Sequence, residues 1–286
     1  MKITNKANLP TAFVKMAESD YTASENEYRV TQLLKGIKET VLEKRHDNEI
    51  ERDCSEMIWL LFGTATHAIM EKQEAEADEL KETRVKINVS DSVLSGQFDL
   101  YSESKKEVTD YKTCSVWKVI YGDTTDWRNQ LLMYAYMMRQ QGFEVERGQV
   151  MAIMKDHSAS KAKFDPSYPQ TPVVSIKFKF TDRDFAFIED FIQKRIEALQ
   201  EASELPDNSI PPCTPEERYN DGDKYAVMKK NRKTALRVLD SKEEAESWIA
   251  DRGGDYIELR PGTDKKCNDY CAVKDFCNHY KEKNNG

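Results

Sequence analysis

The stretch that most constrains what this chain can fold into runs from Gly96 to Lys112. It reads G-Q-F-D-L-Y-S-E-S-K-K-E-V-T-D-Y-K, with apolar residues alternating over 97–101 and again over 108–113. A polar connection, 102–107, separates the two runs. Because a period of two places successive side chains on opposite faces of a strand, this stretch predicts a β-hairpin.

The second predicted strand carries charged residues whose spacing is informative. Asp110 and Lys112 are two residues apart, so both side chains are expected on one face while Tyr111 points to the other. Asp99, on the first strand, is expected at the same end of the sheet. Two carboxylates form an oxygen site suited to Mg²⁺ or Mn²⁺, and a neighbouring lysine can orient a water or stabilise negative charge. A solvated surface strand can carry the same pattern, so these residues alone leave both interpretations open.

The composition limits the classes of protein and partner. With 286 residues, the chain can bury one substantial core and a small appendage, since domains centre on roughly 100–150 residues. The net charge of −8, with 33% charged residues, means that any contact with DNA must come from a local groove. No apolar run approaches about 18 residues and the N-terminus lacks a signal-peptide core, so we expect a cytoplasmic protein without membrane association.

Hydrophobic periodicity predicts an α/β fold in which helices flank a mixed central sheet. Apolar residues recur at helical spacing over 28–43, 54–74, 127–141 and 181–205. Further strands are expected over 84–89, 148–154 and 173–180. The second helix has a broad apolar face that is interrupted only by Gly63. A capping box at Thr181 and Asp184 is expected to open the last helix.

Four prolines within 206–215 predict a boundary between a main domain, 1–210, with a helical N-terminal part, and a C-terminal region, 211–286. The C-terminal region contains a predicted β-β-α-β insert over 221–260. Its strands are expected over 225–228, 234–239 and 256–259, and its helix over 241–250.

Cysteines bracket this insert. In the expected compartment, thiols or metal ligands are favoured over disulfides. One cysteine precedes the insert and three follow it, which supplies a four-thiolate set: Cys213, Cys267, Cys271 and Cys277. Zinc and an iron–sulfur cluster both suit such a set, and the spacing does not decide between them. Because the tail from Asp264 has few apolar residues, a metal centre is expected to order it. Cys54 and Cys114 lie beside apolar elements and are expected in the core.

Three residues on predicted helices complete the set of candidates. His67 follows G-T-A-T, whose small residues allow the helix backbone to approach a sheet closely. A single histidine on an apolar helix is either a satisfied core residue or a ligand. Gln130 and Tyr134 are four residues apart and therefore lie on the same side of their helix.

Four short motifs resemble, in this order, the series that marks PD-(D/E)XK nucleases: G-T-A-T-His67, G-Q-F-Asp99, Asp110-Tyr111-Lys112 and Gln130-x-x-x-Tyr134. The similarity is greatest to the RecB-like branch, which includes phage exonucleases and CRISPR adaptation nucleases with a four-cysteine iron–sulfur site. It covers about residues 55–140 and, through the cysteines, the C-terminus. Phe98 stands where the family motif has a proline.

The resemblance implies a restriction-endonuclease-like core and a role for each motif residue. The catalytic set it implies is Asp99, Asp110, Lys112, Gln130 and Tyr134. The ligands it implies for Mg²⁺ or Mn²⁺ are His67, Asp99, Asp110 and the Tyr111 carbonyl. It also favours a [4Fe–4S] cluster over zinc at the four C-terminal thiols.

From this resemblance we expect a metal-dependent DNA nuclease, with exonuclease activity in phage or bacterial DNA recombination, repair or processing. DNA is the expected partner, together with a recombination or replication protein. The alternative is a non-catalytic DNA-binding or assembly module that retains the fold. The local positive surface for DNA is expected at Lys118, Arg128, Lys229, Lys230, Arg232 and Lys233.

Overall fold

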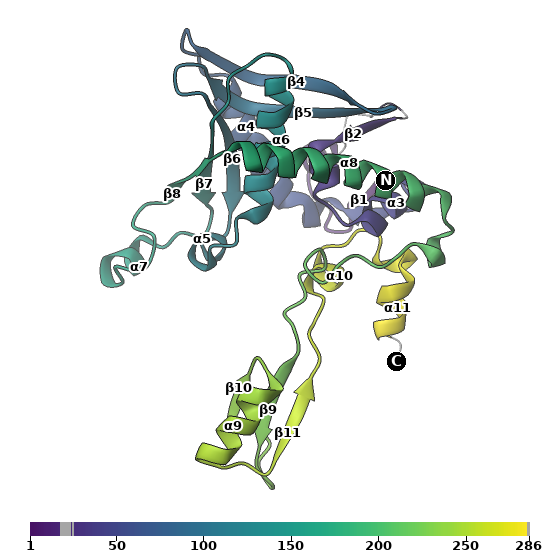
Figure 1. Cartoon of the computed structure of the whole chain (residues 1–286), viewed down its shortest axis with the longest axis vertical. Helices are drawn as coiled ribbons and strands as arrows, with labels where there is room; N and C mark the ends of the chain where they lie inside the picture. Colours follow the sequence, from purple (N-terminus) through teal and green to yellow (C-terminus); the bar gives the residue numbers. More distant parts are fainter. Residues whose placement is uncertain (18–23, 25, 285–286) are drawn as a thin grey trace.

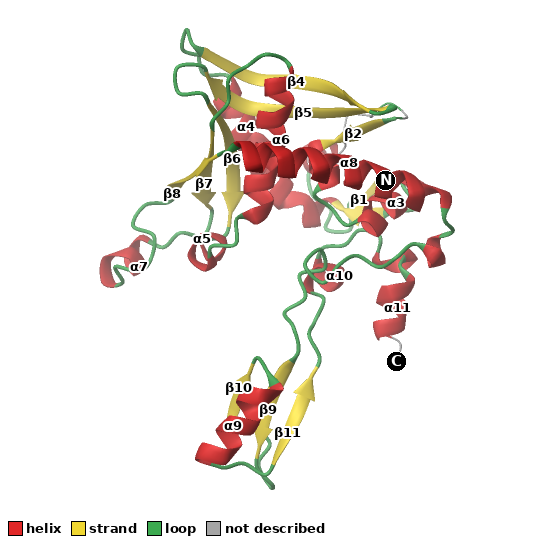
Figure 2. Ribbon diagram, in the orientation of Figure 1, coloured by secondary structure: helices red, strands yellow, loops and turns green. Residues whose placement is uncertain are grey.

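The computed structural model describes residues 1–17, 24 and 26–284; the rest of the predicted domains, 18–23, 25 and 285–286, lies outside this description. The chain forms a body around a central sheet, from which a narrow arm projects (Figure 1). The body combines strands and helices, whereas the arm has its own small sheet and one helix (Figure 2). Among the described residues, no helix is both long enough and apolar enough to cross a membrane.

The central sheet has six strands of mixed orientation. They are β2 (Glu27–Arg29), β4 (Glu79–Val89), β5 (Ser92–Ser102), β6 (Glu107–Cys114), β7 (Arg147–Met154) and β8 (Val173–Lys179). The pairs β2–β5 and β6–β7 are parallel, whereas β4–β5, β5–β6 and β7–β8 are antiparallel. This arrangement confirms the predicted mixed sheet and the hairpin.

Helices flank the sheet, as predicted. On one face, α6 (Thr125–Gln140) and α8 (Asp182–Glu204) pack on each other, and α6 supplies many of the core side chains. Gln130 of α6 contacts Asp110 of β6. Gly63 of α4 (Ile58–Glu71) lies against Thr113 of the same strand. Because side chains alternate along a strand, α4 and α6 lie on opposite faces of β6. The predicted capping box of α8 is confirmed, since Thr181 and Asp184 bond reciprocally.

Smaller elements complete the body. Two short strands pair in parallel, β1 (Lys2–Thr4) and β3 (Glu51–Asp53). The short helices are α1 (Thr11–Ala17), α5 (Val116–Tyr121) and α7 (Ala159–Phe164), and 3₁₀ turns span Cys54–Met57 and Asp207–Ser209.

The helix predicted over 28–43 is wrong in part, because the segment divides into β2, α2 (Val30–Leu33) and α3 (Ile37–Arg45). Gly36 is the N-cap of α3. A Cβ at this position would lie 2.4 Å from Cys213 Sγ, so only glycine fits beside that thiol. Helical periodicity along 28–43 does not reveal this contact, which comes from far along the chain.

The broad apolar face of α4 is largely exposed in the structure. No residue of α4 is buried, and Leu60 and Ile69 are 53% and 59% exposed. The helix contacts mainly β6, α1 and the preceding turn, which leaves much of its apolar surface uncovered. Hydrophobic periodicity predicted the helix correctly but could not predict what would cover it.

The arm confirms the predicted β-β-α-β order. It consists of β9 (Lys224–Met228), β10 (Arg237–Leu239), α9 (Lys242–Arg252) and β11 (Tyr256–Arg260), with both outer strands antiparallel to β9. Lys224 pairs with Arg260 near the body, whereas Met228 pairs with Tyr256 at the other end. The turn between β9 and β10 therefore lies at the distal end of the arm.

After the arm, the chain returns to the body through α10 (Lys265–Asp269), a 3₁₀ turn at Lys274–Phe276 and α11 (Asn278–Asn284). Val273 is buried in the main core, and Phe276 stacks on His46 with ring centroids 4.1 Å apart. The fully buried Lys38 donates to Asn278, and Lys266 pairs with Glu39 at 2.6 Å. These contacts anchor the tail to the body, and its ordering by a metal centre stays a prediction.

Candidate active site

The candidate site lies where β5 and β6 separate. The last pair in the ladder between these strands is Leu100–Thr109. Beyond it, the Asp99 carboxylate replaces the backbone acceptor, and the Tyr111 N–H donates to it at 2.6 Å. A side chain thus satisfies a backbone donor that the neighbouring strand has left unpaired. The same bond fixes one oxygen of Asp99 in the opening between the strands.

Asp110 lies on the α6 side of this opening and is almost fully buried. Lys112 Nζ lies 3.0 Å from Asp110 Oδ1 and 2.9 Å from Oδ2, and Gln130 donates to Oδ1 at 3.3 Å. Oδ2 accepts no aligned hydrogen bond. Burial raises the pKa of Asp110 to about 6, although the nearby Lys112 ammonium opposes this effect. The buried carboxyl therefore retains capacity to bind a further cation.

His67 enters from α4 on the other face. Its Nδ1 lies 3.2 Å from Asp99 Oδ1, and its ring meets the Tyr111 ring edge-on. The hydrogen bond to Asp99 raises the pKa of His67. The structure therefore brings His67 to the sheet beside Asp99, as the small residues before it predicted.

Glu82 belongs to this group, and the sequence analysis missed it. It faces Asp99 across the β4–β5 ladder, which is interrupted between the pairs Lys81–Leu100 and Thr83–Phe98. Its φ of 44° is in the left-handed region, which is strained for a glutamate. Burial raises the pKa of its carboxyl, which accepts from Gln97 at 2.8 Å. Only the strand register could have identified Glu82, because no local motif marks it.

A metal-binding geometry is present at this point. Ligand atoms of His67, Glu82 and Asp99 all lie within 4.8 Å of one another, and within the described residues no other group of three or more His, Cys, Asp or Glu meets this condition. Two carboxylates directly opposite each other on neighbouring strands repel unless a cation lies between them. Imidazole and carboxylate ligands suit Mn²⁺, and the carboxylates suit Mg²⁺, so the donor set fits a divalent ion.

Gln130 and Tyr134 lie behind the carboxylates rather than on the surface. Gln130 Nε2 donates to the Tyr134 hydroxyl at 3.0 Å as well as to Asp110. Tyr134 is buried, and a Cβ at Gly96 would lie 2.6 Å from its ring. The glycine of G-Q-F-D therefore makes room for the tyrosine that holds Gln130 in place. The catalytic role of each residue, and the role of the Tyr111 carbonyl, stay predictions.

The four C-terminal cysteines come from two segments of the chain, one before the arm and one after it. The Glu39 N–H, in the first turn of α3, donates to Cys213, but burial raises the pKa of this thiol to about 11. Burial likewise raises the pKa of Cys271 to about 12, with smaller effects from Cys267 and Cys213, and Cys277 has the same kind of effect on Cys267. Among the described residues these sulfur atoms do not form a group close enough to hold one metal ion, so their joint metal site stays a prediction. Cys54 and Cys114 are buried elsewhere, as predicted.

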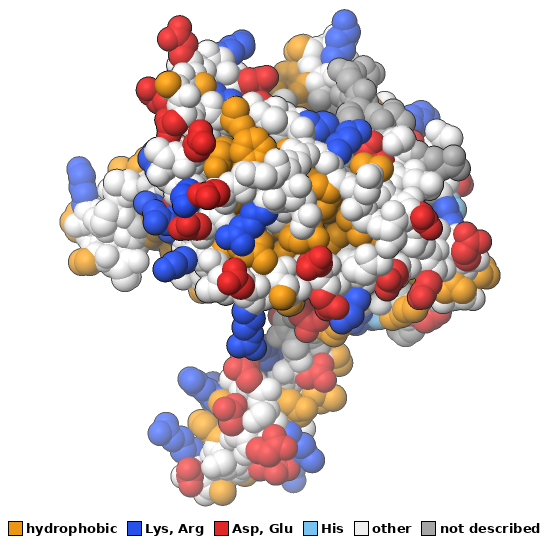
Figure 3. Space-filling view, turned by 45° about the horizontal axis from the view of Figure 1, so that its top comes forward, with side chains coloured by type: hydrophobic (Ala, Val, Ile, Leu, Met, Phe, Trp, Pro, Cys, Tyr) orange, Lys and Arg blue, Asp and Glu red, His pale blue; other side chains and the backbone are white. Residues whose placement is uncertain are grey.

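The cations expected to bind DNA are divided between two places. Lys118 lies 3.1 Å from Asp126, and Arg128 lies 2.5 Å from Asp184, so carboxylates already neutralise both. The other four are exposed on the distal turn of the arm: Lys229, Lys230, Arg232 and Lys233. Blue basic and red acidic side chains are interspersed on the face drawn in Figure 3. Their role in DNA binding stays a prediction.

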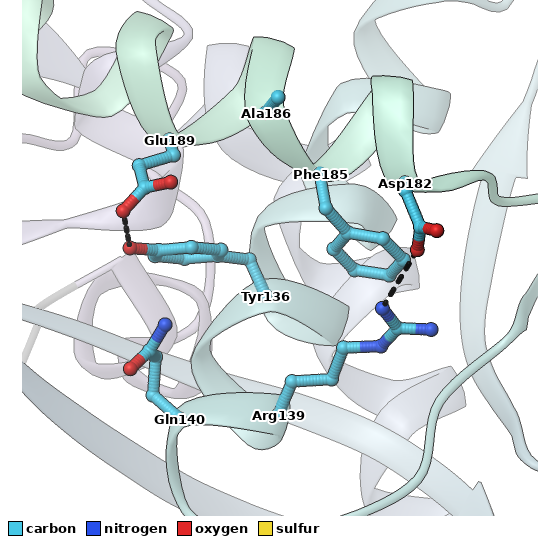
Figure 4. Close-up of a pocket in the computed structure, with 7 residues that line it drawn as sticks. All are labelled: Tyr136, Arg139, Gln140, Asp182, Phe185, Ala186 and Glu189. Carbon is cyan, nitrogen blue, oxygen red and sulfur yellow. Dashed lines mark hydrogen bonds and ion pairs between the residues drawn. The ribbon is translucent and has the colours of Figure 1, made fainter.

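A shallow hollow between α6 and α8 lies apart from these groups. Figure 4 shows Tyr136 bonded to Glu189, and Arg139 directed toward Asp182 beside Phe185. The Arg139 guanidinium lies 3.6 Å from the centre of the Phe185 ring. Its side chains satisfy one another across the two helices, which indicates a packing contact.

The chain is similar to a known protein family and to several solved structures. The family model described as the PD-(D/E)XK nuclease superfamily matches residues 11–278. No curated protein sequence matches the chain. Among solved structures, the protein SSO0001 has 17% identity and a TM-score of 0.44, with 65% of this chain and 82% of that chain covered.

Two exonuclease structures are also similar. LHK-Exo, solved in complex with dAMP, has 11% identity and a TM-score of 0.35, with 61% of this chain and 92% of that chain covered. A phage related exonuclease from Haemophilus somnus 129PT has 16% identity and a TM-score of 0.29, with 68% and 83% covered. All three structural similarities are distant.

Proposed function

Because this chain belongs to the PD-(D/E)XK nuclease superfamily, we propose that it is a divalent-metal-dependent deoxyribonuclease of the RecB-like branch. The proposed activity is that of an exonuclease in phage or bacterial DNA recombination, repair or processing. One observation carries the proposal: Asp99, Asp110 and Lys112 meet where β5 and β6 separate. Two carboxylates can hold a divalent ion and a lysine beside them can orient a water, which together suit phosphodiester hydrolysis.

The proposed ligands of Mg²⁺ or Mn²⁺ are His67, Glu82 and Asp99, with Asp110 adjacent. The opposed carboxylates of Glu82 and Asp99, and the unfilled Oδ2 of Asp110, support this assignment. When bound, such an ion supplies positive charge to the scissile phosphate and lowers the pKa of a coordinated water.

The chain's own residues would prepare the reaction in three ways. Lys112, held by Asp110, would orient the attacking water and stabilise the negative charge that develops on the phosphate. Gln130 would hold the Asp110 carboxyl from behind, with Tyr134 fixing Gln130. His67 must be neutral to act as a ligand, so its raised pKa predicts weaker metal binding in acid.

The alternative is a non-catalytic DNA-binding or assembly module with the same fold. A protein that had lost catalysis would have no reason to keep a buried carboxyl with a raised pKa beside a lysine, since such a group costs stability. The presence of Asp99, Asp110 and Lys112 together therefore favours the enzyme.

The test is cleavage of end-labelled single- and double-stranded DNA with Mg²⁺ or Mn²⁺. We expect digestion that stops with EDTA and falls by roughly 10²–10³-fold or more in Asp110→Asn and in Lys112→Ala. The control is Asp190→Asn, which alters an exposed carboxylate on α8 and should keep the wild-type rate. Wild-type digestion by Asp110→Asn would show that the site is misassigned. DNA binding without digestion by the unaltered protein would favour the module.

A second metal centre is part of this proposal. Cys213, Cys267, Cys271 and Cys277 would bind one [4Fe–4S] cluster, with zinc as the alternative. The effects of these thiols on one another's pKa and the Glu39 N–H directed at Cys213 support the assignment. The ligands are thiolates, so binding must displace their protons. We also propose that the chain divides into two domains, 1–210 and 211–286. A recombination or replication protein is the proposed partner.

A further inference from the structure

An exposed aromatic surface lies beside the candidate site. On α4, Trp59, Leu60 and Phe62 are each at least half exposed. On α5, Trp117 and Tyr121 are 46% and 78% exposed, and their rings stack with centroids 5.7 Å apart. Large aromatic side chains are costly to leave in water, so a group of them on two neighbouring elements indicates a binding surface.

The position of this surface is tied to the site by the chain. Its α5 part begins just after β6, the strand that carries Asp110 and Lys112, with Ser115 as the N-cap. Asp156, which follows β7, accepts from Ser115 and from the Val116 N–H at 2.7 Å each. The surface therefore lies at the carboxyl ends of the parallel strands β6 and β7, where sites in α/β sheets commonly lie. In Figure 1, α5 and α7 lie at this end of the sheet.

Ammonium groups lie beside two of the exposed rings. Lys155 Nζ lies 3.7 Å from the centre of the Trp59 ring, and the Lys155 N–H donates to the Cys114 carbonyl at the end of β6. Lys161 Nζ, on α7, lies 5.1 Å from the Trp117 ring. Both lysines are exposed. The surface thus holds two pairs of a ring and an ammonium group, Trp59 with Lys155 and Trp117 with Lys161.

We propose that this surface binds single-stranded DNA, with bases stacked on Trp59, Trp117 and Tyr121 and phosphates bound by Lys155 and Lys161. The inference deepens the proposed nuclease function and rests on it for the direction of the strand. Aromatic rings offer stacking to any unpaired base, and lysines beside them suit a phosphate backbone. A duplex hides its base faces, so it cannot use the rings in this way.

The spacing along α4 fits a strand that continues into the site. Trp59 and His67 are eight residues apart on this helix, which is about 12 Å at 1.5 Å per residue. A stacked strand with a rise of about 3.4 Å per nucleotide covers this distance in three or four nucleotides. The bases on Trp59 would then lie a few nucleotides from the phosphate at the acidic site.

Charge favours DNA over the other occupants of an apolar surface. A partner surface of apolar side chains would bury the Lys155 and Lys161 ammonium groups against rings without adding a counter-charge, which is costly. A polyanion supplies that counter-charge at each of these pairs.

The test measures binding in EDTA, where no cleavage occurs, by fluorescence anisotropy of labelled oligo-dT and of a blunt duplex. We expect the single strand to bind at least tenfold more tightly than the duplex at equal salt. Trp117→Ala and Trp59→Ala should each weaken single-strand binding about tenfold, or about 1.4 kcal/mol. Trp117→Phe should keep most of the affinity, because a ring remains for stacking. Phe187→Ala, which removes a half-exposed ring from α8, is the matched control and should change nothing.

Wild-type affinity in both tryptophan variants, with circular dichroism showing intact folding, would overturn the proposal. Self-association of the wild type that Trp59→Ala abolishes, with DNA binding unchanged, would also overturn it in favour of a second copy. The nuclease proposal fails separately: tryptophan-dependent binding without cleavage in Mg²⁺ or Mn²⁺ supports the surface and refutes the enzyme. Cleavage in Mg²⁺ or Mn²⁺ that neither tryptophan substitution reduces supports the enzyme and refutes the surface.

Discussion

The acidic site and the four C-terminal cysteines reach their positions by different means. Strand register fixes Glu82 opposite Asp99, and the Tyr111 N–H holds Asp99 in place. The thiols come from separate segments: Cys213 lies before the arm, and the other three lie after it on the returning tail. The carboxylates are close enough for one ion, whereas the four thiols form no such group among the described residues.

This difference concerns what organises each centre before a metal binds. Repulsion between the carboxylates is built into the sheet, whose hydrogen bonds hold them together despite their charge. Burial raises the pKa of Cys213 and Cys271, so these two thiols are neutral at pH 7 and do not repel each other. A bound metal would relieve the repulsion between the carboxylates of the acidic site. At the cysteines it would replace the thiol protons.

The largest expected effect tests the organisation of the acidic site. Glu82→Gln keeps the size of the side chain but removes its charge, so we expect metal-dependent cleavage to fall roughly 10–100-fold and the required Mn²⁺ concentration to rise. Titration of activity against Mn²⁺ measures both. The control is Glu103→Gln, in the turn between β5 and β6, which should behave as wild type. Unchanged Mn²⁺ dependence in Glu82→Gln would remove Glu82 from the proposed ligands and leave His67, Asp99 and Asp110.

A variant of the thiol centre should lose its metal while the fold survives. In Cys271→Ser we expect loss of the cluster's broad visible absorbance, or of zinc, and faster hydrogen exchange in the tail. The anchors Val273, Lys38 and Lys266 should keep the body folded. Anaerobic purification with metal analysis measures the content, and a colourless protein with one zinc per chain would decide for zinc.

Cys54→Ser and Cys114→Ser are the controls for this experiment, because both thiols are buried away from the centre. Both should retain full metal content. Cys213→Ser should lose metal like Cys271→Ser. Full content in Cys213→Ser would mean that a residue other than Cys213 supplies the fourth ligand.

A smaller effect distinguishes the two centres by their pH dependence. The folded pKa of Asp110, about 6, exceeds its ordinary value of 3.8, so ionising this carboxyl costs folding free energy. The cost is absent well below the ordinary pKa, grows as the pH rises, and is complete above the folded pKa. It reaches about 3 kcal/mol at pH 8 and about half of that at pH 5. Without metal, Asp110→Asn should therefore raise the melting temperature by several degrees at pH 8 and by less at pH 5.

Calorimetry at both pH values checks this expectation. Asp78→Asn is a control of opposite sign, because hydrogen bonds from Ser104 and Ser102 lower the pKa of Asp78 and its ionised form is the stabilising one. A lower melting temperature for Asp110→Asn at pH 8 would show that the ion pair with Lys112 outweighs burial.

The smallest expected effect asks whether DNA also contacts the arm, which is rooted near the thiols. Changing Lys229, Lys230, Arg232 and Lys233 to Ser should weaken DNA binding several-fold and reduce its salt dependence, since each phosphate contact releases a counterion. Binding measured at several salt concentrations gives both quantities. Because the turn is exposed at the distal end, cleavage by saturated enzyme should not change. Equal salt slopes for variant and wild type would restrict DNA to the body.

The sequence predicted what depends on local periodicity and failed where distant contacts decide. The hairpin, the cap at Thr181 and the arm follow from spacing along the chain, and the structure confirms them. Glu82 could not be predicted, because its place depends on how β4 registers against β5. The exposure of α4 could not be predicted either, since an apolar pattern does not tell what covers it. Helical periodicity along 28–43 likewise does not reveal the contact of Gly36 with Cys213, far along the chain.

The base of the arm has a consequence for how such proteins can vary. Asn220 bridges to Asp264, and the Asp221 N–H donates to the Thr263 carbonyl at 3.3 Å, so the chain leaves the body and returns to it at one point. The two ends of the segment between these residues are in contact, so for the body the arm takes the place of a short turn. Lengthening, shortening or exchanging this segment would add little loop-closure cost to the body. We therefore expect the body to keep its fold when this arm is shortened or exchanged at the same position.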